Sequence, residues 1–490
     1  MSIPETNLDS LLEHVPSCEL EGSKRVKIAH ITQDSRKVRK GSLFVAISGT
    51  QFDGNEYVDE ALHRGAKAIV SERKVKLPAD ITGIWVANAR EALAEIAAAF
   101  YGNPCRDLRV IGVTGTNGKT SVCYLLQAIL KAAGWKTGRF GTTGHDLGRR
   151  NLPARMTTPE SLQLQEMLSE LKSSGYDSVV MEVSSHALEQ ERVRGIRFRV
   201  GIYTNLSQDH LDYHIDMTDY LEAKKKLFQK LDPDALGVVN LDDAHGREMV
   251  ENVKCRFVTY GLENDAEVTA RDVVSSLNGT AFLLVTPKGQ AETNLSIGGD
   301  FNVSNFLAAA AAAQGLGVGL EAIVRGAAQI EGVPGRAEVI ESPKGKIMVD
   351  YAHTPGALEA LLSWAARYTE GQLLVLFGAG GDRDRTKRPL MGEVACSLAD
   401  RIILTSDNPR SEDPNEIVSD ILTGIDSEKR LRVDVVLDRR EAIRHGIEIL
   451  EEKDTLIIAG KGHERVQVFH RQEVPFDDRE TVKEVLRSAG

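Results

Sequence analysis

Apolar residues between Leu108 and Leu241 recur in short blocks that alternate with longer amphipathic stretches. The short blocks have the length of buried strands, and the longer stretches show the three-to-four-residue spacing of helices. Strands that alternate with helices predict a mostly parallel sheet covered on both faces. The strand-like runs are Val110–Thr114, Ser178–Val183, Val200–Asn205 and Ala235–Leu241, and the helical stretches include Ser161–Ser173 and Thr218–Leu231.

The same alternation restarts after Val333-Pro334-Gly335 and predicts a further, Rossmann-like unit. The first 104 residues mix short strands and helices, and the pair Asn103-Pro104 marks a boundary because the residue before proline resists helix. A chain of 490 residues has room for about three domains. We therefore expect an α/β protein with domains at residues 1–104, 105–333 and 334–490. The strand-like runs of the last domain are Lys346–Asp350, Leu373–Phe377, Arg401–Thr405 and Thr455–Ala459.

Composition narrows the classes of function. The chain is 42% hydrophobic and 27% charged, and its net charge of −11 disfavours nucleic acid and anionic membranes as partners. Its five cysteines lack paired spacing, which indicates reduced thiols rather than a disulfide framework or a zinc site. No secretory signal is visible at the N-terminus, and no run approaches the roughly 18 apolar residues that span a bilayer. We expect a cytoplasmic protein that binds neither nucleic acid nor membranes.

The segment from Thr114 to Ser121 carries the clearest chemical signal. A strand-like run enters a glycine-rich turn, and the turn delivers Lys119 and Thr120 at the start of a helical pattern. Backbone N–H groups and the helix N-terminus then face an anion, Lys119 adds a charge, and the Thr120 hydroxyl can reach Mg²⁺. The general P-loop pattern requires its first glycine where Val113 stands. The segment is therefore either a chance near-match or a particular variety of P-loop.

Three further segments carry polar residues in or near this predicted sheet. Glu182 and the segment that contains His210 each follow a strand, where ligands of parallel sheets bind. A carboxylate suits Mg²⁺, and an imidazole can serve a second divalent ion, but a surface carboxylate and a solvated loop fit the residues as well. Lys224, Lys225 and Lys226 point in different directions on a predicted helix, so one can face the site or all can be solvated.

Taken together, these motifs resemble the Mur ligase family. The resemblance runs from Asp34 to Glu464, and the family's own phosphate loop has the form Thr-Gly-Thr-Asn-Gly-Lys-Thr, which accounts for Val113. It implies an N-terminal UDP-sugar domain, a central ATP domain and a C-terminal amino-acid domain. The motifs that carry it are Thr114–Thr120, Glu182–His186, Thr204–Leu206, Asp209–Asp212, Gly299–Asn305, Gly335-Arg336 and Asp350–Pro355.

Within the family, the chain resembles the synthetases that add the third residue to UDP-N-acetylmuramoyl-L-alanyl-D-glutamate. The resemblance implies that Lys119, Glu182, His210 and Lys224 are catalytic, and that Thr120, Glu182, His210 and carbamylated Lys224 hold Mg²⁺. For ATP it implies Gly115, Thr116, Asn117, Gly118, Lys119, Thr120, Ser121, Asn302, Arg336 and Asp350. For the UDP-muramoyl-dipeptide it implies Ser35, Thr157, Thr158, Ser184, Gln190 and Arg192.

The run Asp407-Asn408-Pro409-Arg410 resembles the motif of the family's meso-2,6-diaminopimelate enzymes. Diaminopimelate has a carboxylate and an amine at its far end, whereas lysine ends in a bare ammonium. The Arg410 guanidinium can hold that carboxylate with two hydrogen bonds and repel an ammonium. By the same resemblance, the remaining contacts to diaminopimelate are Arg383, Gly460 and Glu464. The negative charge of Glu464 suits the positively charged amine at the far end of diaminopimelate.

The resemblance implies transfer of the ATP γ-phosphoryl group to the D-glutamyl side-chain carboxylate and attack of the amine on the acyl phosphate. Positioning and charge neutralisation would carry most of the catalysis, and closure of the third domain would exclude water. Three alternatives stay open: the same ligase with L-lysine, a folylpolyglutamate synthetase-like ligase, and a non-catalytic nucleotide-binding relative. We expect a monomer that acts on small molecules.

Overall fold

A computed structural model of the chain describes residues 5–49, 52–470 and 472–489, so the first four residues of the polar N-terminal segment lie outside it. The described residues form two compact units. The first lies within residues 1–112, 135–201 and 229–235, and the second lies within residues 113–134, 202–228 and 236–490.

The N-terminal part of the first unit is a five-stranded sheet with the order β2-β7-β6-β5-β4. Strands β4 to β7 pair in parallel and β2 is antiparallel to β7. All residues of β5 (Ser42–Ala46) are buried, as the continuous apolar run predicts for a strand with both faces covered. The other strands are β2 (Glu19–Glu21), β4 (His30–Thr32), β6 (Ala66–Ser71) and β7 (Thr82–Trp85).

Short helices cover this sheet. Helix α3 (Ala89–Phe100) begins where the Asn88 side chain accepts from the N–H groups of Arg90 and Glu91, and it packs with α1 (Leu8–Leu12). Helix α2 (Val58–His63) and the 3₁₀ turns η1 (Ser35–Lys37) and η2 (Gly54–Tyr57) lie near one another.

The central sheet has eight strands in the order β11-β10-β9-β12-β8-β13-β14-β15. Strand β12 pairs in parallel with β9, and β14 pairs in parallel with β15, whereas β10 is antiparallel to β9 and to β11. The strands are β8 (Arg109–Thr114), β9 (Thr137–Gly141), β10 (Gly144–Asp146), β11 (Asn151–Leu152), β12 (Ser178–Glu182), β13 (Phe198–Tyr203), β14 (Leu236–Asn240) and β15 (Arg256–Tyr260).

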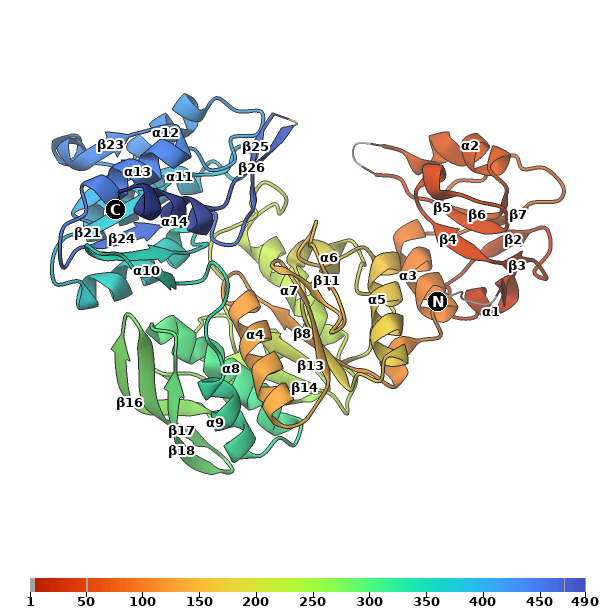
Figure 1. Cartoon of the computed structure of the whole chain (residues 1–490). Coiled ribbons are helices and arrows are strands. Elements are labelled where there is room, and N and C mark those ends of the chain that lie inside the picture. Colours follow the sequence, from red (N-terminus) through yellow and green to blue (C-terminus); the bar gives the residue numbers. More distant parts are fainter. Residues whose placement is uncertain (1–4, 50–51, 471, 490) are drawn as a thin grey trace. The chain divides into compact units, whose positions relative to one another are not determined.

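Two helices of the central segment match predicted stretches: α5 has the predicted bounds, and α7 begins one residue before and ends two residues before the predicted Thr218–Leu231 (Figure 1). Helix α4 packs against α8 and α9, and a Cβ atom on Gly326 of α9 would lie 2.4 Å from the Ile129 Cα, so this crossing requires a glycine. Six consecutive alanines of α8 are buried, because small side chains let it approach its neighbours closely. The helices are α4 (Lys119–Ala132), α5 (Ser161–Ser173), α6 (Ser185–Glu189), α7 (Met217–Gln229), α8 (Asp300–Gly315) and α9 (Leu320–Ala328).

A three-stranded antiparallel sheet in the second unit has no counterpart among the sequence predictions. It comprises β16 (Thr269–Ser276), β17 (Gly279–Thr286) and β18 (Gly289–Leu295), and α9 packs against β18. Burial along β17 alternates through much of its length, so one face of this sheet packs inward and the other is open.

The C-terminal sheet has six strands in the order β19-β20-β24-β21-β22-β23. Strand β19 is antiparallel to β20, and the other neighbours pair in parallel. The strands are β19 (Glu338–Ile340), β20 (Lys346–Val349), β21 (Leu373–Phe377), β22 (Arg401–Leu404), β23 (Val433–Val435) and β24 (Thr455–Ile458).

Both faces of this sheet are covered, as β21 shows. Its residues Leu373, Val375 and Phe377 pack into a core with α10, α11 and α12, whereas Leu374 and Leu376 pack into a second core with α13 and α14. These helices are α10 (Pro355–Tyr368), α11 (Lys387–Leu398), α12 (Pro414–Leu422), α13 (Arg439–Glu448) and α14 (Asp478–Ala489). A hairpin of β25 (Val466–Phe469) and β26 (Gln472–Pro475) follows β24. The predicted fold class, α/β with mostly parallel sheets, is confirmed.

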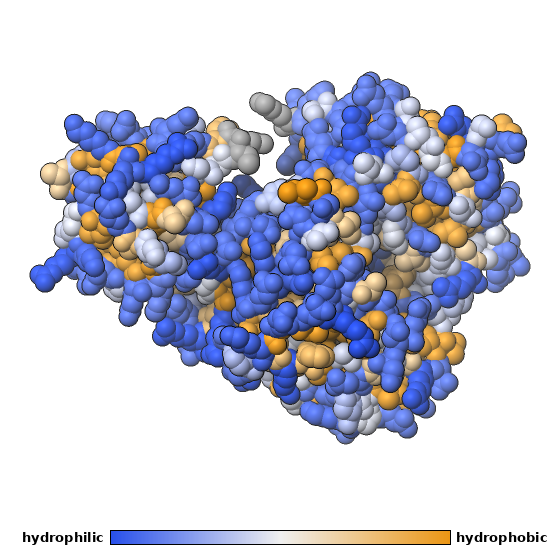
Figure 2. All heavy atoms as spheres, turned by 180° about the vertical axis from the view of Figure 1, so that it is seen from behind, coloured by the Kyte–Doolittle hydropathy of each residue, from blue (hydrophilic) through white to orange (hydrophobic). Residues whose placement is uncertain are grey.

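Hydrophilic residues cover most of the face drawn in Figure 2, and apolar residues appear there in small groups. Within the described ranges, every helix is too short or too polar to cross a bilayer.

Candidate active site

The phosphate loop lies between β8 and α4, where the sequence predicts it. Gly115 has φ +142° and Gly118, the residue before α4, has φ +84°, conformations that favour glycine. Position 115 also has no room for a side chain, because a Cβ atom on Gly115 would lie 1.8 Å from the Thr204 Oγ1. Val113 belongs to the buried strand β8, so the turn begins two residues later and needs no glycine there.

The segment after β13 holds the loop in place. The N–H of Thr116 donates to the Asn205 carbonyl at 2.8 Å, and the N–H of Asn117 donates to the Asn205 Oδ1 at 3.0 Å. The Asn117 Nδ2 donates to the Ser207 Oγ at 3.1 Å. The Lys119 ammonium lies against the loop, where it donates to the carbonyls of Gly115 and Thr116 at 2.8 and 2.7 Å. The two strand ends therefore form one preorganised turn.

Residues predicted for the nucleotide lie around this loop in the second unit. The Arg336 Nη2 donates to the Thr120 Oγ1 at 3.2 Å, and the guanidinium carbon lies 4.5 Å from the centre of the Tyr351 ring. Asn302 is buried in the first turn of α8, where its side chain donates to the Gly298 carbonyl at 2.7 Å. A Cβ atom on Gly118 would lie 2.3 Å from the Asn305 Oδ1, so α8 borders the loop directly.

Asp350 follows β20 and closes the turn that carries Arg336. Its carboxylate accepts from the N–H groups of Ala337 and Ala352 at 2.7 and 2.6 Å. Burial raises the pKa of Asp350, although Arg336 and the two N–H groups oppose this effect. The carboxylate thus fixes the loop that presents Arg336.

Of the three consecutive lysines Lys224, Lys225 and Lys226, only Lys224 is buried. Its side chain is 1% exposed, and its Nζ lies 4.0 Å from the centre of the Tyr220 ring. Burial, with Lys119 nearby, holds the pKa of Lys224 well below its ordinary range. Lys225 instead pairs with the carboxylates of Glu222 and Glu248. A lowered pKa increases the share of uncharged, nucleophilic amine, and of these two lysines only Lys224 has that environment.

His210 lies beside a buried carboxylate that sequence reasoning did not single out. Its backbone has φ +58°, and its Nε2 lies 3.4 Å from the Asp209 Oδ2. Asp209 also lies 3.5 Å from the His353 Nε2 and 3.2 Å from the Lys387 Nζ. Burial alone would raise the pKa of Asp209, but Lys387 and the histidines hold it well below its usual range. The only sequence signal was its place in the motif before His210.

The remaining predicted Mg²⁺ ligand, Glu182, lies at the end of β12 in the first unit. It is 1% exposed, and its carboxylate accepts from the Thr142 N–H and hydroxyl at 2.9 and 3.0 Å. Among the described residues there is no group of three or more His, Cys, Asp or Glu side chains arranged for a metal. The predicted ligand set, which includes a threonine and a modified lysine, stays a prediction.

Five residues predicted for the UDP-muramoyl-dipeptide lie around Glu182. The Thr158 hydroxyl donates to the Glu182 carbonyl at 2.9 Å and accepts from the Ser184 N–H at 3.0 Å. The Arg192 Nη1 donates to the Thr158 carbonyl at 3.1 Å, and its Nε donates to the Gln190 Oε1 at 3.1 Å. Thr157 joins them, since its hydroxyl accepts from the Thr142 hydroxyl at 3.2 Å.

Ser35, the sixth predicted residue, lies on η1 beside the N-terminal sheet. Its hydroxyl donates to the Glu60 Oε2 at 2.7 Å. Of the residues predicted for this substrate, it alone lies in the N-terminal part of the first unit.

The residues predicted for diaminopimelate form a third group, at the carboxyl ends of β22 and β24. The Asn408 Nδ2 donates to the Glu464 Oε2 at 2.8 Å, and a Cβ atom on Gly460 would lie 2.7 Å from the Asp407 Oδ2. Burial would raise the pKa of Asp407, but Lys461 and Arg439 keep it below its ordinary value. The two loops are therefore in direct contact, and the Asp407 carboxylate stays ionised.

Arg410 has a left-handed backbone with φ +52°, an unusual conformation for a long side chain. The hairpin supports this conformation, because the Arg410 N–H donates to the Val468 carbonyl and the His470 N–H donates to the Arg410 carbonyl. The Arg410 Nη1 donates to the Gly381 carbonyl at 2.6 Å. Burial and the neighbouring Arg383 lower the pKa of Arg410. Two nearby guanidinium groups form a site that suits an anion.

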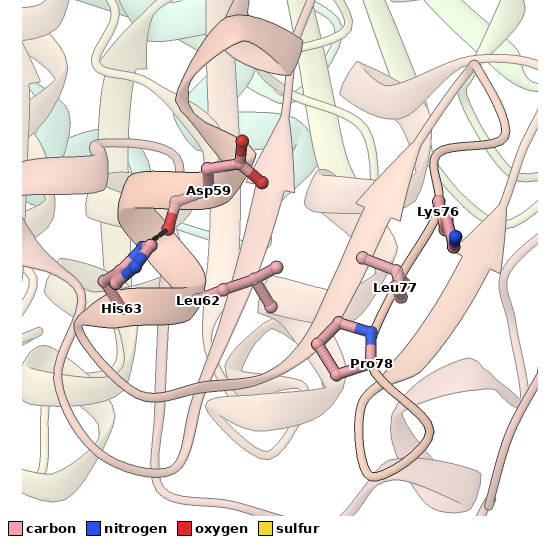
Figure 3. A pocket seen from close by; sticks show the side chains of 6 residues that line it. All are labelled: Asp59, Leu62, His63, Lys76, Leu77 and Pro78. Carbon is pink, nitrogen blue, oxygen red and sulfur yellow. Dashed lines mark hydrogen bonds between the residues drawn. The ribbon is translucent and has the colours of Figure 1, made fainter.

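A separate pocket of about 570 Å³ lies in the N-terminal part of the first unit and contains none of the predicted residues. Figure 3 shows Asp59, Leu62 and His63 of α2 on one side and Lys76, Leu77 and Pro78 on the other. The His63 Nδ1 lies 2.6 Å from the Asp59 carbonyl oxygen, a bond within the helix. The six residues that line this pocket lack the convergent polar groups seen at the strand ends.

A phosphate loop on a mostly parallel sheet, with a cationic group at the ends of a Rossmann-like sheet, defines a nucleotide-binding α/β protein. Comparison with known proteins narrows this class. The family model "Mur ligase family, catalytic domain" matches residues 27–101. The model "Mur ligase middle domain" matches residues 113–313, and the model "Mur ligase, glutamate ligase domain" matches residues 335–462.

Relatives match almost the whole chain. UDP-N-acetylmuramoyl-L-alanyl-D-glutamate–2,6-diaminopimelate ligase of Alkaliphilus metalliredigens is 42% identical over 99% of this chain and 98% of its own length. The enzyme with the same description from Caldanaerobacter subterraneus is 44% identical over 96% of each chain. A solved structure of such a ligase has a TM-score of 0.69 and 35% identity over 99% of each chain. The chain belongs to the Mur ligase family of ATP-dependent amide ligases, and it is itself a ligase.

Proposed function

We propose that this ligase adds meso-2,6-diaminopimelate to UDP-N-acetylmuramoyl-L-alanyl-D-glutamate, with ATP as the energy source, in peptidoglycan precursor synthesis. The observation that carries the proposal is Arg410, which lies beside Arg383 and in the same loop as Asn408, whose side chain donates to Glu464. Two guanidinium groups suit the far carboxylate of diaminopimelate, and Glu464 suits the ammonium next to it. The relatives of about 40% identity carry the corresponding description.

We further propose three domains, at residues 1–104, 105–333 and 334–490. The boundaries agree with the gaps between the matched segments 27–101, 113–313 and 335–462. The first domain would hold the uridine end of the UDP substrate through Ser35, the second ATP, and the third the amino acid. Thr157, Thr158, Ser184, Gln190 and Arg192 would hold the rest of the UDP-muramoyl-dipeptide.

The nucleotide site follows from the loop geometry. Residues 115–121 would surround the ATP phosphates with N–H groups, and the N-terminus of α4 would face them. Lys119 would exchange its present carbonyl partners for phosphate oxygens, because an ammonium forms stronger bonds with an anion. Asn302, Arg336 and Asp350 would contact the base, the phosphates and the ribose.

As ligands of Mg²⁺ we propose the Thr120 hydroxyl, the Glu182 carboxylate, the His210 imidazole and carbamylated Lys224. Oxygen donors suit this ion, and a carbamate on Lys224 would supply further ones. The buried amine of Lys224, with its lowered pKa, fits that modification, in which the amine adds to CO₂ and releases a proton. When bound, Mg²⁺ would neutralise the charge of the transferring phosphoryl group.

The reaction then proceeds in two steps. The γ-phosphoryl group moves from ATP to an oxygen of the D-glutamyl side-chain carboxylate, and ADP is released. The free amine of diaminopimelate attacks the acyl carbon, an amide bond forms, the amine loses a proton, and phosphate leaves. Lys119 and Arg336 would hold the phosphates, while Arg410 and Glu464 would orient the amino acid.

Phosphate release tests the proposal. The purified protein should release phosphate only when ATP, Mg²⁺, the UDP-muramoyl-dipeptide and diaminopimelate are all present. Turnover with L-lysine equal to that with diaminopimelate would refute the specificity, and turnover with a folate in place of the UDP substrate would favour a folylpolyglutamate synthetase-like ligase. Absence of turnover with any amino acid would favour a non-catalytic relative.

We also propose that the protein acts in the cytoplasm as a monomer on small molecules alone. ATP and UDP-linked precursors occur in that compartment, and the surface in Figure 2 is largely hydrophilic. Light scattering of the purified protein would measure the oligomeric state.

A further inference from the structure

Lys461 is a fully buried lysine that no step of the proposed reaction uses. It follows Gly460 after β24, and its side chain is 0% exposed. Its ammonium donates to the Asn408 Oδ1 at 3.0 Å and to the Glu464 Oε2 at 2.8 Å. Since Asn408 also donates to Glu464 at 2.8 Å, the three side chains form a closed triangle. Lysine is rarely buried completely, because its charge must be compensated by partners.

The triangle connects two loops that are far apart in the sequence. One loop carries Asp407 and Arg410, and the other carries Gly460 and Glu464. The Val468 N–H also donates to the Asn408 Oδ1 at 3.0 Å, so the β25–β26 hairpin is attached to the same point. An ammonium at this point therefore fixes the separation of the groups proposed to bind the amino acid.

Lys461 also balances the charge of two carboxylates. Asp407 and Glu464 belong to the same group, and Lys461 makes the largest contribution to the lowered pKa of Asp407, against the effect of burial. Arg439 contributes less to Asp407, and both its Nε and its Nη2 already bind Asp478. The other charged or titratable groups that face Asp407 or Glu464 are Arg410, His353 and Tyr351.

We propose that Lys461 is a positioning residue for the amino-acid substrate, which holds the side chains of Glu464 and Asn408 in place. This inference rests on the proposed function, because it assumes that these side chains bind diaminopimelate. Lys461 touches no reacting atom in this scheme. It acts through Glu464, the carboxylate proposed to receive the far ammonium of the substrate.

The experiment compares Lys461→Met and Lys461→Gln, which remove the charge, with Lys461→Arg, which keeps it. Lys453→Met is the matched control, because Lys453 lies in the same domain with a 63% exposed side chain paired to Glu370. Phosphate release of the full-length enzyme gives kcat and KM for diaminopimelate and for ATP from pH 5.5 to 9. Wild-type turnover with diaminopimelate is measured first, since its absence would refute the proposed function and not the role of Lys461.

The charge-removing variants should raise the KM for diaminopimelate about tenfold or more and leave the KM for ATP within about threefold. Without Lys461, burial raises the pKa of Asp407, so the acid limb of kcat/KM for diaminopimelate should move to higher pH by about one unit or more. Lys461→Arg and Lys453→Met should keep the wild-type limb.

A merely structural lysine would give a different result. Folded Lys461→Met or Lys461→Gln enzyme with a wild-type acid limb and KM for diaminopimelate would overturn the proposal. Failure of both charge-removing variants to fold, together with wild-type KM values and a wild-type acid limb in Lys461→Arg, would also overturn it, because the charge would then serve stability alone.

Discussion

Replacement of Arg410 by alanine is the most direct test of the amino-acid site. Arg410 has φ +52°, a left-handed conformation that costs roughly 1–2 kcal/mol for any residue with a Cβ atom. Alanine pays the same backbone cost as arginine, whereas glycine would relieve it and mix two effects. Arg410→Ala therefore removes the guanidinium and leaves the backbone bonds to Val468 and His470 available.

The size of the effect follows from the contacts of the guanidinium. One N–H of Arg410 already donates to the Gly381 carbonyl, and its other N–H donors can bind a carboxylate side by side. A hydrogen bond between charged groups contributes about 1.5–3 kcal/mol, and Arg383 nearby retains part of the positive charge. We therefore expect a loss of about 2–4 kcal/mol in the binding of diaminopimelate, which is about 30- to 1,000-fold in kcat/KM.

The assay is phosphate release with diaminopimelate and with L-lysine as alternative substrates. The KM for diaminopimelate should rise, the KM for ATP should not, and the preference over L-lysine should fall because the repulsion of its ammonium is removed. Arg385→Ala is the control, since Arg385 lies in the same region but is 57% exposed and pairs with Glu412, Glu416 and Asp420, none of which is proposed to bind diaminopimelate. An Arg410→Ala enzyme that keeps the wild-type preference would refute the reasoning.

Three further predictions concern the loop, the lysine and pH. Gly115→Ala should abolish ATP-dependent phosphate release, because the new Cβ atom would lie 1.8 Å from the Thr204 hydroxyl oxygen. The control is Gly134→Ala, which has φ +87° but open space around it and should reduce stability alone. Equal activity of the two variants would contradict the steric argument. Lys224→Ala should reduce kcat about 100-fold or more, with partial rescue by a short carboxylic acid, and full activity would exclude the carbamate. Burial lowers the pKa of His145 from 6.5 to about 4, so the unfolded chain binds more protons than the folded chain between these pH values. The free energy of unfolding should therefore fall by about 3 kcal/mol as pH falls from 6.5 to 4. His145→Gln should reduce this fall, measured by chemical denaturation at several pH values, and an unchanged dependence on pH would contradict the reasoning.

The sequence predicted regular elements best where one pattern continued for many residues. Helix α5 has the predicted bounds Ser161–Ser173, and β21 has the predicted bounds Leu373–Phe377, because a covered parallel strand is apolar throughout and a helix repeats every three to four residues. The antiparallel strands β16 to β18 were missed. They lack a continuous buried apolar run, because most of β16 is exposed, including Val274 at 70%, and β18 is largely polar.

The residues of the candidate site also differ in how far the sequence alone could predict them. Gly115, Gly118, Lys119 and Thr120 could be recognised from the sequence, because a turn of this kind is made by consecutive residues whose types are dictated by backbone angle and charge. Asp209 and Lys387 could not, since they are 178 residues apart and become informative only when they lie 3.2 Å from each other in a buried pair. A lone aspartate or lysine has the same appearance in a sequence whether it is buried or solvated.

By itself, the sequence determined the α/β class, the phosphate loop and the residues that carry the family resemblance, because each depends on local patterns and on residue types. Only the tertiary structure decided which of three neighbouring lysines is buried, how the backbone of Arg410 is held, and that Lys461 lies between Asn408 and Glu464. Charge, burial and hydrogen bonding are properties of a side chain's surroundings. Those surroundings form only when distant segments pack together.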